Sequence, residues 1–88
     1  MKAGRLASGE VAVEAALKGK KAKLIILAED ASENTKNKFL NSAKFYAADL
    51  IEYGNKSELG YALGKGERSV IAVTDSGFAA KLKEMSVN

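Results

Sequence analysis

Two acidic residues follow a fully apolar run in the stretch LIILAEDASENTKNK, which covers residues 24–38. Asp30 and Glu33 stand three residues apart, and two nearby carboxylates can act as a general acid and a general base. The same spacing is typical of a capping box, in which the start of a helix satisfies its own N–H groups. Because no base, nucleophile or metal ligand stands near them in a recognisable spacing, we interpret the pair as a helix cap.

Two further stretches resemble reactive motifs without matching them. ALGKGERS, residues 62–69, is rich in glycine, but a phosphate-binding P-loop needs a strand before it and Gly-Lys-Ser/Thr at its end. We expect Gly64 to end a helix there, with Lys65 and Arg68 in the polar loop that follows. TDSGF, residues 74–78, lacks the glycine pair of a nucleophile elbow, so Ser76 is expected at a helix start.

The composition argues against catalysis. The chain has 88 residues and contains no His, Cys, Pro or Trp. Without His it lacks the commonest general base and the commonest metal ligand, and without Cys it has neither disulfides nor thiolate metal sites. We therefore expect a protein that is not an enzyme and that needs no metal or cofactor. The length predicts one domain over residues 1–88.

The charge balance favours an anionic partner. The net charge is +3, which is modest but positive. Four lysines are clustered at Lys18, Lys20, Lys21 and Lys23. Two interpretations stay open for them, because cations at a helix C-terminus offset the helix dipole and lysines also contact phosphates. No window has the length of a signal-peptide core or a membrane span, so we predict a cytoplasmic protein without a membrane partner.

Short apolar runs alternate with helical patterns along the chain. Buried strands are expected at 23–28, 49–53 and 69–73, with a shorter one around residues 5–6. Helices are expected at 8–18, 30–47, 55–64 and 75–85. Strands that alternate with helices in this way predict an α/β fold, a three-layer α-β-α sandwich.

The same patterns predict which residues cap the helices and which face the core. Ser8 is a good N-cap for the first helix, and Asn55 with Glu58 has capping-box spacing. Each of the four helices follows a strand, and its free N–H groups favour an anion. The residues expected on the inner face of the first helix are Val11, Ala15 and Leu17, and those expected to be half-buried are Tyr46, Tyr53 and Tyr61.

A family resemblance rests on two long stretches. SGEVAVEAALKGKKAKLIILAEDASENTK (8–36) and NKSELGYALGKGERSVIAVTD (55–75) resemble the kink-turn RNA-binding ribosomal protein superfamily, in particular its small bacterial YlxQ-type branch. The resemblance extends roughly over residues 4–82 and is strongest in ELGYALG. It implies a sandwich around a small mixed sheet, and RNA as the partner, ribosomal RNA included.

The resemblance also implies a set of contact residues. Ala7 to Glu10 stand where the family has Gly-x-Asn-Glu at the first helix start, and Gly9 replaces the base-reading Asn. Asp30 matches the acid of the turn after the first long strand, and Lys56 a phosphate-facing lysine. The residues expected to bind RNA are Ser8, Gly9, Glu10, Asp30, Lys36, Lys56, Lys65 and Arg68.

The replacement at Gly9 has a physical consequence. An Asn side chain offers a donor and an acceptor to a base edge, and Gly offers neither, which removes about 1–3 kcal/mol of base discrimination. We therefore expect a weakened or altered kink-turn preference. The alternative is a protein-interaction adaptor on the same scaffold. A compact apolar patch favours the adaptor, whereas a basic strip joining Lys36, Lys56 and Arg68 favours RNA.

Overall fold

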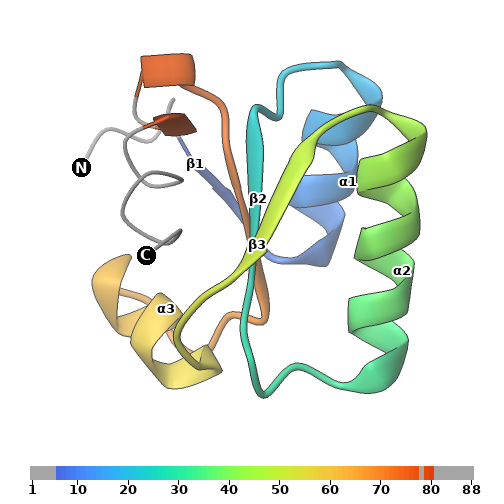
Figure 1. The fold of residues 1–88 in the computed structure, drawn as a ribbon. Coiled ribbons are helices and arrows are strands. Elements are labelled where there is room, and N and C mark those ends of the chain that lie inside the picture. Colours follow the sequence, from blue (N-terminus) through green and yellow to red (C-terminus); the bar gives the residue numbers. More distant parts are fainter. Residues whose placement is uncertain (1–5, 78, 81–88) are drawn as a thin grey trace.

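The computed structural model of the chain describes residues 6–77 and 79–80, and it contains a four-stranded sheet with helices on both faces (Figure 1). In chain order the elements are β1 (Leu6–Ser8), α1 (Glu10–Lys18), β2 (Leu24–Leu27), α2 (Glu33–Phe45), β3 (Asp49–Glu52), α3 (Lys56–Ala62) and β4 (Val70–Val73). This order and the layers confirm the predicted three-layer α/β sandwich, including the short first strand.

The sheet is mixed, and its topology decides where the helices begin. The strand order is β1-β4-β2-β3; β2 and β3 are parallel, and β4 is antiparallel to both β1 and β2. The strands β1, β2 and β3 therefore run in the same direction and β4 runs in the opposite direction. Because α1, α2 and α3 each follow one of the three co-directional strands, all three helices begin at the same end of the sheet.

The helix after β4 does not share the end of the sheet where α1, α2 and α3 begin. Because β4 runs the other way, this helix starts at the opposite end of the sheet. Residues 76–77 and 79–80 are helical. Most of the predicted range 75–85 lies outside the described residues.

The core lies on both faces of the two central strands. Every residue of β2 and of β4 is buried, as expected for strands covered by helices on each side. The helices α1 and α2 cover one face and α3 lies on the other (Figure 1). Phe39 of α2 and Val13 and Leu17 of α1 are almost completely buried against the first face.

Some predicted core positions are wrong. In α1 the buried residues are Val13, Ala16 and Leu17, while Val11 is 83% exposed and Ala15 is also exposed. The buried set has the spacing i, i+3, i+4, so it defines one side of the helix, and residue 11 falls on the other side.

The predicted half-burial also fails for two of the three tyrosines. Tyr61 is 87% exposed and Tyr53 is 55% exposed, whereas Tyr46 is half-buried. An aromatic side chain alone does not fix which side of its element faces the core.

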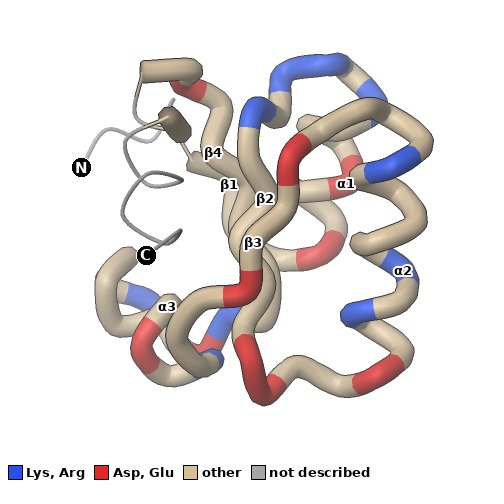
Figure 2. Tube along the Cα trace, in the orientation of Figure 1, with Lys and Arg blue, Asp and Glu red and all other residues tan. Residues whose placement is uncertain are grey.

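The charged residues are distributed over both ends of the molecule. Figure 2 shows basic segments interleaved with acidic ones where the three helices start, and a nearly continuous basic run at the opposite end. Among the described residues, no helix is long and apolar enough to cross a bilayer.

Candidate nucleic-acid interface

The helix-start end of the molecule is defined here by the last residues of β1, β2 and β3 and the first residues of α1, α2 and α3. Its geometry follows from the strand register, which places Ser8 of β1 beside Ile71, and Leu27 of β2 beside Val70. Each of the eight predicted RNA-contact residues lies in or next to one of these helix starts or in the loop between α3 and β4.

The start of α1 keeps free backbone donors. Gly9 is the N-cap, with φ 92° and ψ 159°, and no side chain of the described residues caps this helix. The prediction that Ser8 is the N-cap is therefore wrong; Ser8 instead ends strand β1, paired with β4. The Gly9 N–H donates to the Val70 carbonyl at 3.1 Å. Within the described part of the chain, the next three N–H groups, at residues 10–12, have no hydrogen-bond acceptor, so they can donate to an anion.

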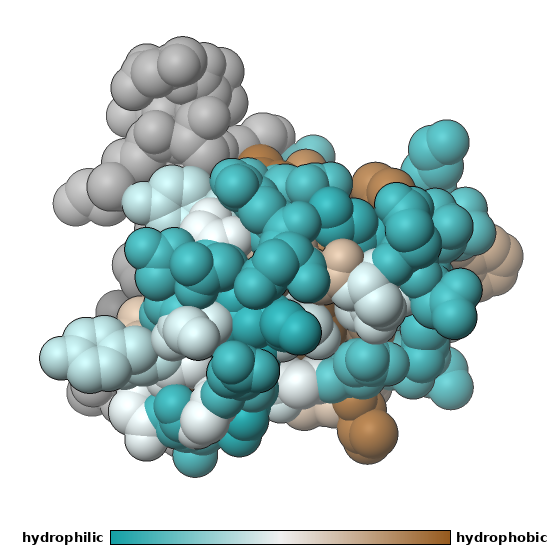
Figure 3. Space-filling view, turned by 90° about the horizontal axis from the view of Figure 1, so that it is seen from below, coloured by the Kyte–Doolittle hydropathy of each residue, from teal (hydrophilic) through white to brown (hydrophobic). Residues whose placement is uncertain are grey.

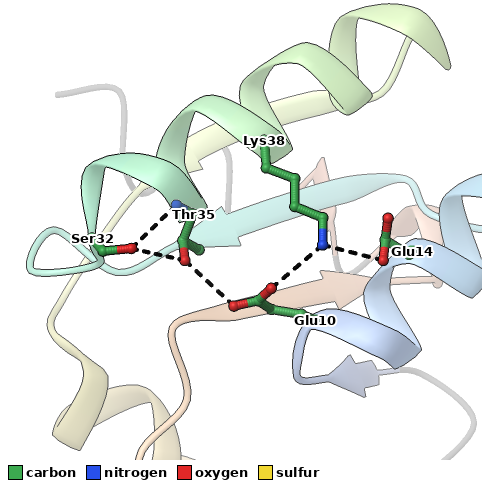
Figure 4. Close-up of polar contacts among 5 residues, drawn as sticks. All are labelled: Glu10, Glu14, Ser32, Thr35 and Lys38. Carbon is green, nitrogen blue, oxygen red and sulfur yellow. Dashed lines mark hydrogen bonds and ion pairs between the residues drawn. The ribbon is translucent and has the colours of Figure 1, made fainter.

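The Glu10 carboxylate links α1 to α2 (Figure 4). Its Oε2 accepts from Thr35 Oγ1 at 3.4 Å, and its Oε1 lies 3.5 Å from Lys38 Nζ. Lys38 also pairs with Glu14 at 3.4 Å. All these contacts are long and exposed, so they hold the carboxylate weakly.

The start of α2 is capped by Ser32, whose side chain accepts from the Thr35 N–H at 3.2 Å. The expectation that Asp30 caps α2 in a box with Glu33 is therefore wrong. A serine stands immediately before the helical pattern, and this position is where an N-cap is required. The type and place of Ser32 could have shown this from the sequence.

Asp30 stabilises a different helix. Its Oδ1 accepts from the Lys56 N–H at 2.8 Å, at the first residue of α3. The predicted capping box of Asn55 and Glu58 is confirmed, with both reciprocal hydrogen bonds present. Carboxylate and amide oxygens therefore already occupy N–H groups at this helix start. We infer that α3 presents side-chain charge to a partner rather than open backbone donors.

Lys56 and Arg68 are adjacent in space although twelve residues separate them in the chain. The Arg68 N–H donates to the Lys56 carbonyl at 3.1 Å. The Arg68 guanidinium donates to the carbonyls of Glu67 at 2.8 Å and Gly66 at 3.2 Å, so the loop itself positions this cation. The Lys56 side chain makes no ion pair within the part of the chain that is described.

Gly60 allows the loop of Arg68 to approach α3 closely. A Cβ at this position would lie 2.1 Å from the Gly66 carbonyl oxygen, which no side chain tolerates. The Lys65 N–H donates to the Gly60 carbonyl at 2.8 Å, and the Lys65 side chain is exposed. Gly60 of the ELGYALG stretch thus allows the loop with two predicted contact residues, Lys65 and Arg68, to pack against α3.

Lys36 belongs to the same end but to the other layer. It lies in the first turns of α2, and its Nζ is 3.5 Å from Glu52 Oε1 at the end of β3. This contact partly neutralises its charge. The predicted strip through Lys36, Lys56 and Arg68 is therefore interrupted by acids, and Figure 2 shows both charge signs at this end.

The surface of this end is mainly hydrophilic. Figure 3 views the molecule from below, and its apolar areas are separate from one another. The exposed large apolar side chains of the described residues come from α1, α2, the residue after β3, and α3: Val11, Leu40, Phe45, Tyr53 and Tyr61. In residues 6–77 and 79–80, no group of three or more acidic side chains could hold a metal ion.

Comparisons with known proteins agree with this architecture. The model of the Ribosomal protein L7Ae/L30e/S12e/Gadd45 family matches residues 1–83. A relative from Enterococcus faecium, described as RNA-binding protein YlxQ, is 39% identical over 97% of this chain and 82% of its own length. A relative of the same description from Bacillus subtilis is 40% identical over 92% and 81%. A solved structure, described as a protein with unknown function from Bacillus halodurans C, has 40% identity and a TM-score of 0.89, covering 94% of this chain and 84% of its own.

Proposed function

Because the chain belongs to the Ribosomal protein L7Ae/L30e/S12e/Gadd45 family, we propose that residues 1–88 form one domain that binds structured, kink-turn-like RNA at the helix-start end. The single observation that most supports this is the start of α1, where three successive N–H groups are uncapped. The family and the descriptions of both relatives point to a protein that is not an enzyme.

The roles of the contact residues differ. The α1 start supplies backbone donors, and Glu10 supplies an acceptor for a base edge once it leaves its weak contacts with α2. Lys56, Lys65 and Arg68 supply phosphate contacts, which position an RNA without reading its sequence. Asp30 acts indirectly, because it holds the first turn of α3 where Lys56 stands. Lys36 contributes once it exchanges Glu52 for a phosphate.

Kink-turn selectivity is the part of the function most affected by Gly9. Its conformation leaves the approach to the helix start open, since no atom lies within 4 Å of a Cβ at this position. An RNA backbone or base can come close there, but no side chain reads it. We propose that the chain prefers bent RNA by shape and by backbone contacts, with less sequence discrimination than an Asn would give.

The test is a salt titration with two RNA probes, a kink-turn duplex and a straight duplex of equal length. Wild-type protein should bind the kink-turn duplex more tightly. The double variant Lys56→Gln, Arg68→Gln should bind it more weakly, with a log–log salt slope lower by about one for each contact removed.

A charge-matched control separates local contacts from overall charge. Asn37 and Asn41 are exposed on α2, and Asn37→Glu with Asn41→Glu changes the net charge by the same two units. This control should keep the wild-type slope. Equal, weak binding of both RNA probes by the wild type would contradict the kink-turn preference, and no binding at low salt would contradict RNA binding itself.

A protein-interaction adaptor is less well supported, because the exposed large apolar residues that the structure describes are distributed over α1, α2, the end of β3 and α3. Ribosomal RNA as the particular partner and a cytoplasmic location stay predictions. Crosslinking in cells, followed by sequencing of the attached RNA, addresses the first of these.

A further inference from the structure

The opposite end of the molecule has a basic surface that the proposed interface does not use. It consists of the residues of the α1–β2 turn and the last turn of α2, and we call it the lysine turn: Lys18, Lys20, Lys21, Lys23 and Lys44. All five are exposed. Among residues 6–77 and 79–80, the ion pairs involve Lys36 and Lys38 and none of these five. Figure 2 shows the basic segments of the α1–β2 connection and of the end of α2 at the same end of the molecule.

Compensation of helix dipoles does not account for this cluster. Lys18 and Lys44 stand in the last turns of α1 and α2, where a cation is favourable. The dipole effect falls off within the last turn. Lys20, Lys21 and Lys23 lie beyond the end of α1, so three of the charges need another explanation.

Lys20 stands in a backbone conformation that normally favours glycine. Its φ is 57°, and its N–H donates to the Leu17 carbonyl while that of Lys21 donates to Ala16. This pair of bonds defines a Schellman motif with Lys20 at its left-handed position. Gly19 precedes it with φ −82° and does not use its conformational freedom there. The chain thus has a lysine where a glycine would fold with less strain.

A hollow of about 240 Å³ lies beside these lysines. Its walls include Lys20 and Lys23 from the turn, Tyr46 from the end of α2, and Asp49 as the one acid. The hollow is smaller than the roughly 300–1,000 Å³ of ordinary small-molecule pockets, so it suits a single flat or compact group. The two cations can contact a phosphate of a nucleic acid, and the aromatic ring can contact the attached base.

An exposed aromatic ring borders the same region. Phe45 is the last residue of α2 and is 80% exposed. Its ring lies 4.9 Å from that of Tyr46 in an edge-to-face arrangement. Basic residues interleaved with aromatic rings are typical of surfaces that bind nucleic acid through backbone charge and base stacking.

We propose that the lysine turn is a second RNA-binding surface, which contacts the sugar–phosphate backbone without sequence selectivity. This inference builds on the proposed function, since an RNA held at the helix-start end brings its flanking segments to the rest of the molecule. The longest dimension of the molecule is 28 Å, so an RNA arm has to extend only about that far to pass from one end of the molecule to the other. A flanking arm or a second strand therefore reaches both ends.

The experiment compares three variants with equal net charge. The first is Lys20→Gln with Lys23→Gln, which removes both lysines of the hollow. The second is Lys56→Gln with Arg68→Gln, at the helix-start end. The third is the α2 control, Asn37→Glu with Asn41→Glu. Binding of a straight RNA duplex and of a kink-turn duplex is measured against salt, and circular dichroism melting verifies that each variant folds.

The first variant should lower the salt slope for the straight duplex by about two, while the α2 control leaves it unchanged. A second pair of variants, Lys20→Gly and Ala47→Gly, tests Lys20 alone. Ala47 serves as the comparison because it has the same φ of 57° at the end of α2. Lys20→Gly should lower the slope by about one, whereas Ala47→Gly should not change it. Both substitutions relieve a left-handed backbone position, but only Lys20→Gly removes a charged side chain. Ala47 also lines the hollow, so this pair compares two changes at the same site.

The outcomes separate this inference from the proposed function. If the variant Lys20→Gln with Lys23→Gln binds both RNA probes with the affinity and salt slope of the wild type, the second surface is overturned. The helix-start interface is tested separately, by the variant Lys56→Gln with Arg68→Gln. If kink-turn preference is absent but straight-duplex binding depends on Lys20 and Lys23, the second surface stands alone. Binding to phosphatidylserine vesicles that depends on these lysines, with RNA binding unchanged, would identify a membrane-facing surface and overturn the proposal.

Discussion

Gly9 occupies a region of φ and ψ that residues with a side chain rarely adopt, at φ 92° and ψ 159°. The position opens the first helix and donates to β4, and the family resemblance predicts an Asn there. The resemblance therefore predicts that Gly9 lacks a base contact that an Asn would make. The structure adds that the backbone itself differs from what Asn prefers, so motif alignment alone does not describe this site.

Replacement of Gly9 should therefore cost stability even where it adds a contact. Gly9→Ala and Gly9→Asn should each lower the free energy of unfolding by about 1–3 kcal/mol, the strain of this region for a side-chain-bearing residue. Urea denaturation followed by circular dichroism measures the change. Gly19→Ala is the control, because Gly19 has φ −82° and tolerates a side chain. Equal effects at both positions would contradict the strain argument.

At the helix-start end, the residue type of a carboxylate does not determine which partner it contacts. Asp30 and Glu10 are both acids near helix starts, yet Asp30 anchors α3 and Glu10 links α1 to α2. Each contact joins segments at least 25 residues apart in the chain. Local spacing cannot specify such partners, because they are chosen by the packing of the layers.

The C-terminal ends of α1, α2 and α3 share one backbone motif. The three helices all end with the paired hydrogen bonds of a Schellman motif, with Lys20, Ala47 and Gly64 at the left-handed position. Only the third of these has the residue type that this conformation favours. The sequence indicated helix ends near Gly19 and Gly64 correctly, but it did not indicate that Lys20 takes the strained position.

Glycine at the other two positions should stabilise the fold. The left-handed conformation costs about 1–2 kcal/mol for an ordinary residue, and glycine loses roughly 0.5–1 kcal/mol more backbone entropy on folding. Lys20→Gly and Ala47→Gly should each raise the free energy of unfolding by about 0.5–1 kcal/mol. Chemical denaturation tests both, with Lys21→Gly as the neighbouring control. A loss of stability in either variant would contradict the assignment of strain.

The whole molecule depends on one core shared by both faces of the sheet. Phe39 is completely buried, and it is the largest of the fully buried side chains. Its neighbour Leu40 is 40% exposed. The helix rotates about 100° from one residue to the next, so Phe39 faces the core directly and Leu40 points partly toward solvent.

Truncation of the two neighbours should therefore differ clearly. Phe39→Ala should lower the free energy of unfolding by about 3–5 kcal/mol, which is much of the roughly 5–15 kcal/mol total of a small domain. Leu40→Ala should cost less than about 1.5 kcal/mol, since part of that side chain is in water in the folded state. Guanidinium denaturation gives both values. Similar losses for the two variants would contradict the packing of α2.

Charged residues are arranged differently at the helix-start end and at the lysine turn, and the order of residues in the sequence does not show this difference. Basic residues at the helix-start end come from α2, α3 and the loop before β4, and acids lie between them. Those of the lysine turn come mainly from one short segment with few acids beside it. The net charge of +3 is therefore a poor guide to either surface, whose fields depend on local arrangement.

The amino-acid sequence by itself determined the elements, because apolar periodicity, caps and glycine stops act over a few residues. It indicated the strands, α1 to α3, the capping box at Asn55, and the family through ELGYALG. Only the tertiary structure decided that β4 runs against the other strands, which gathers three helix starts at one end and leaves the lysine turn at the other. Strand direction and the partners of Asp30 and Glu10 depend on contacts between distant segments, and no local pattern encodes those contacts.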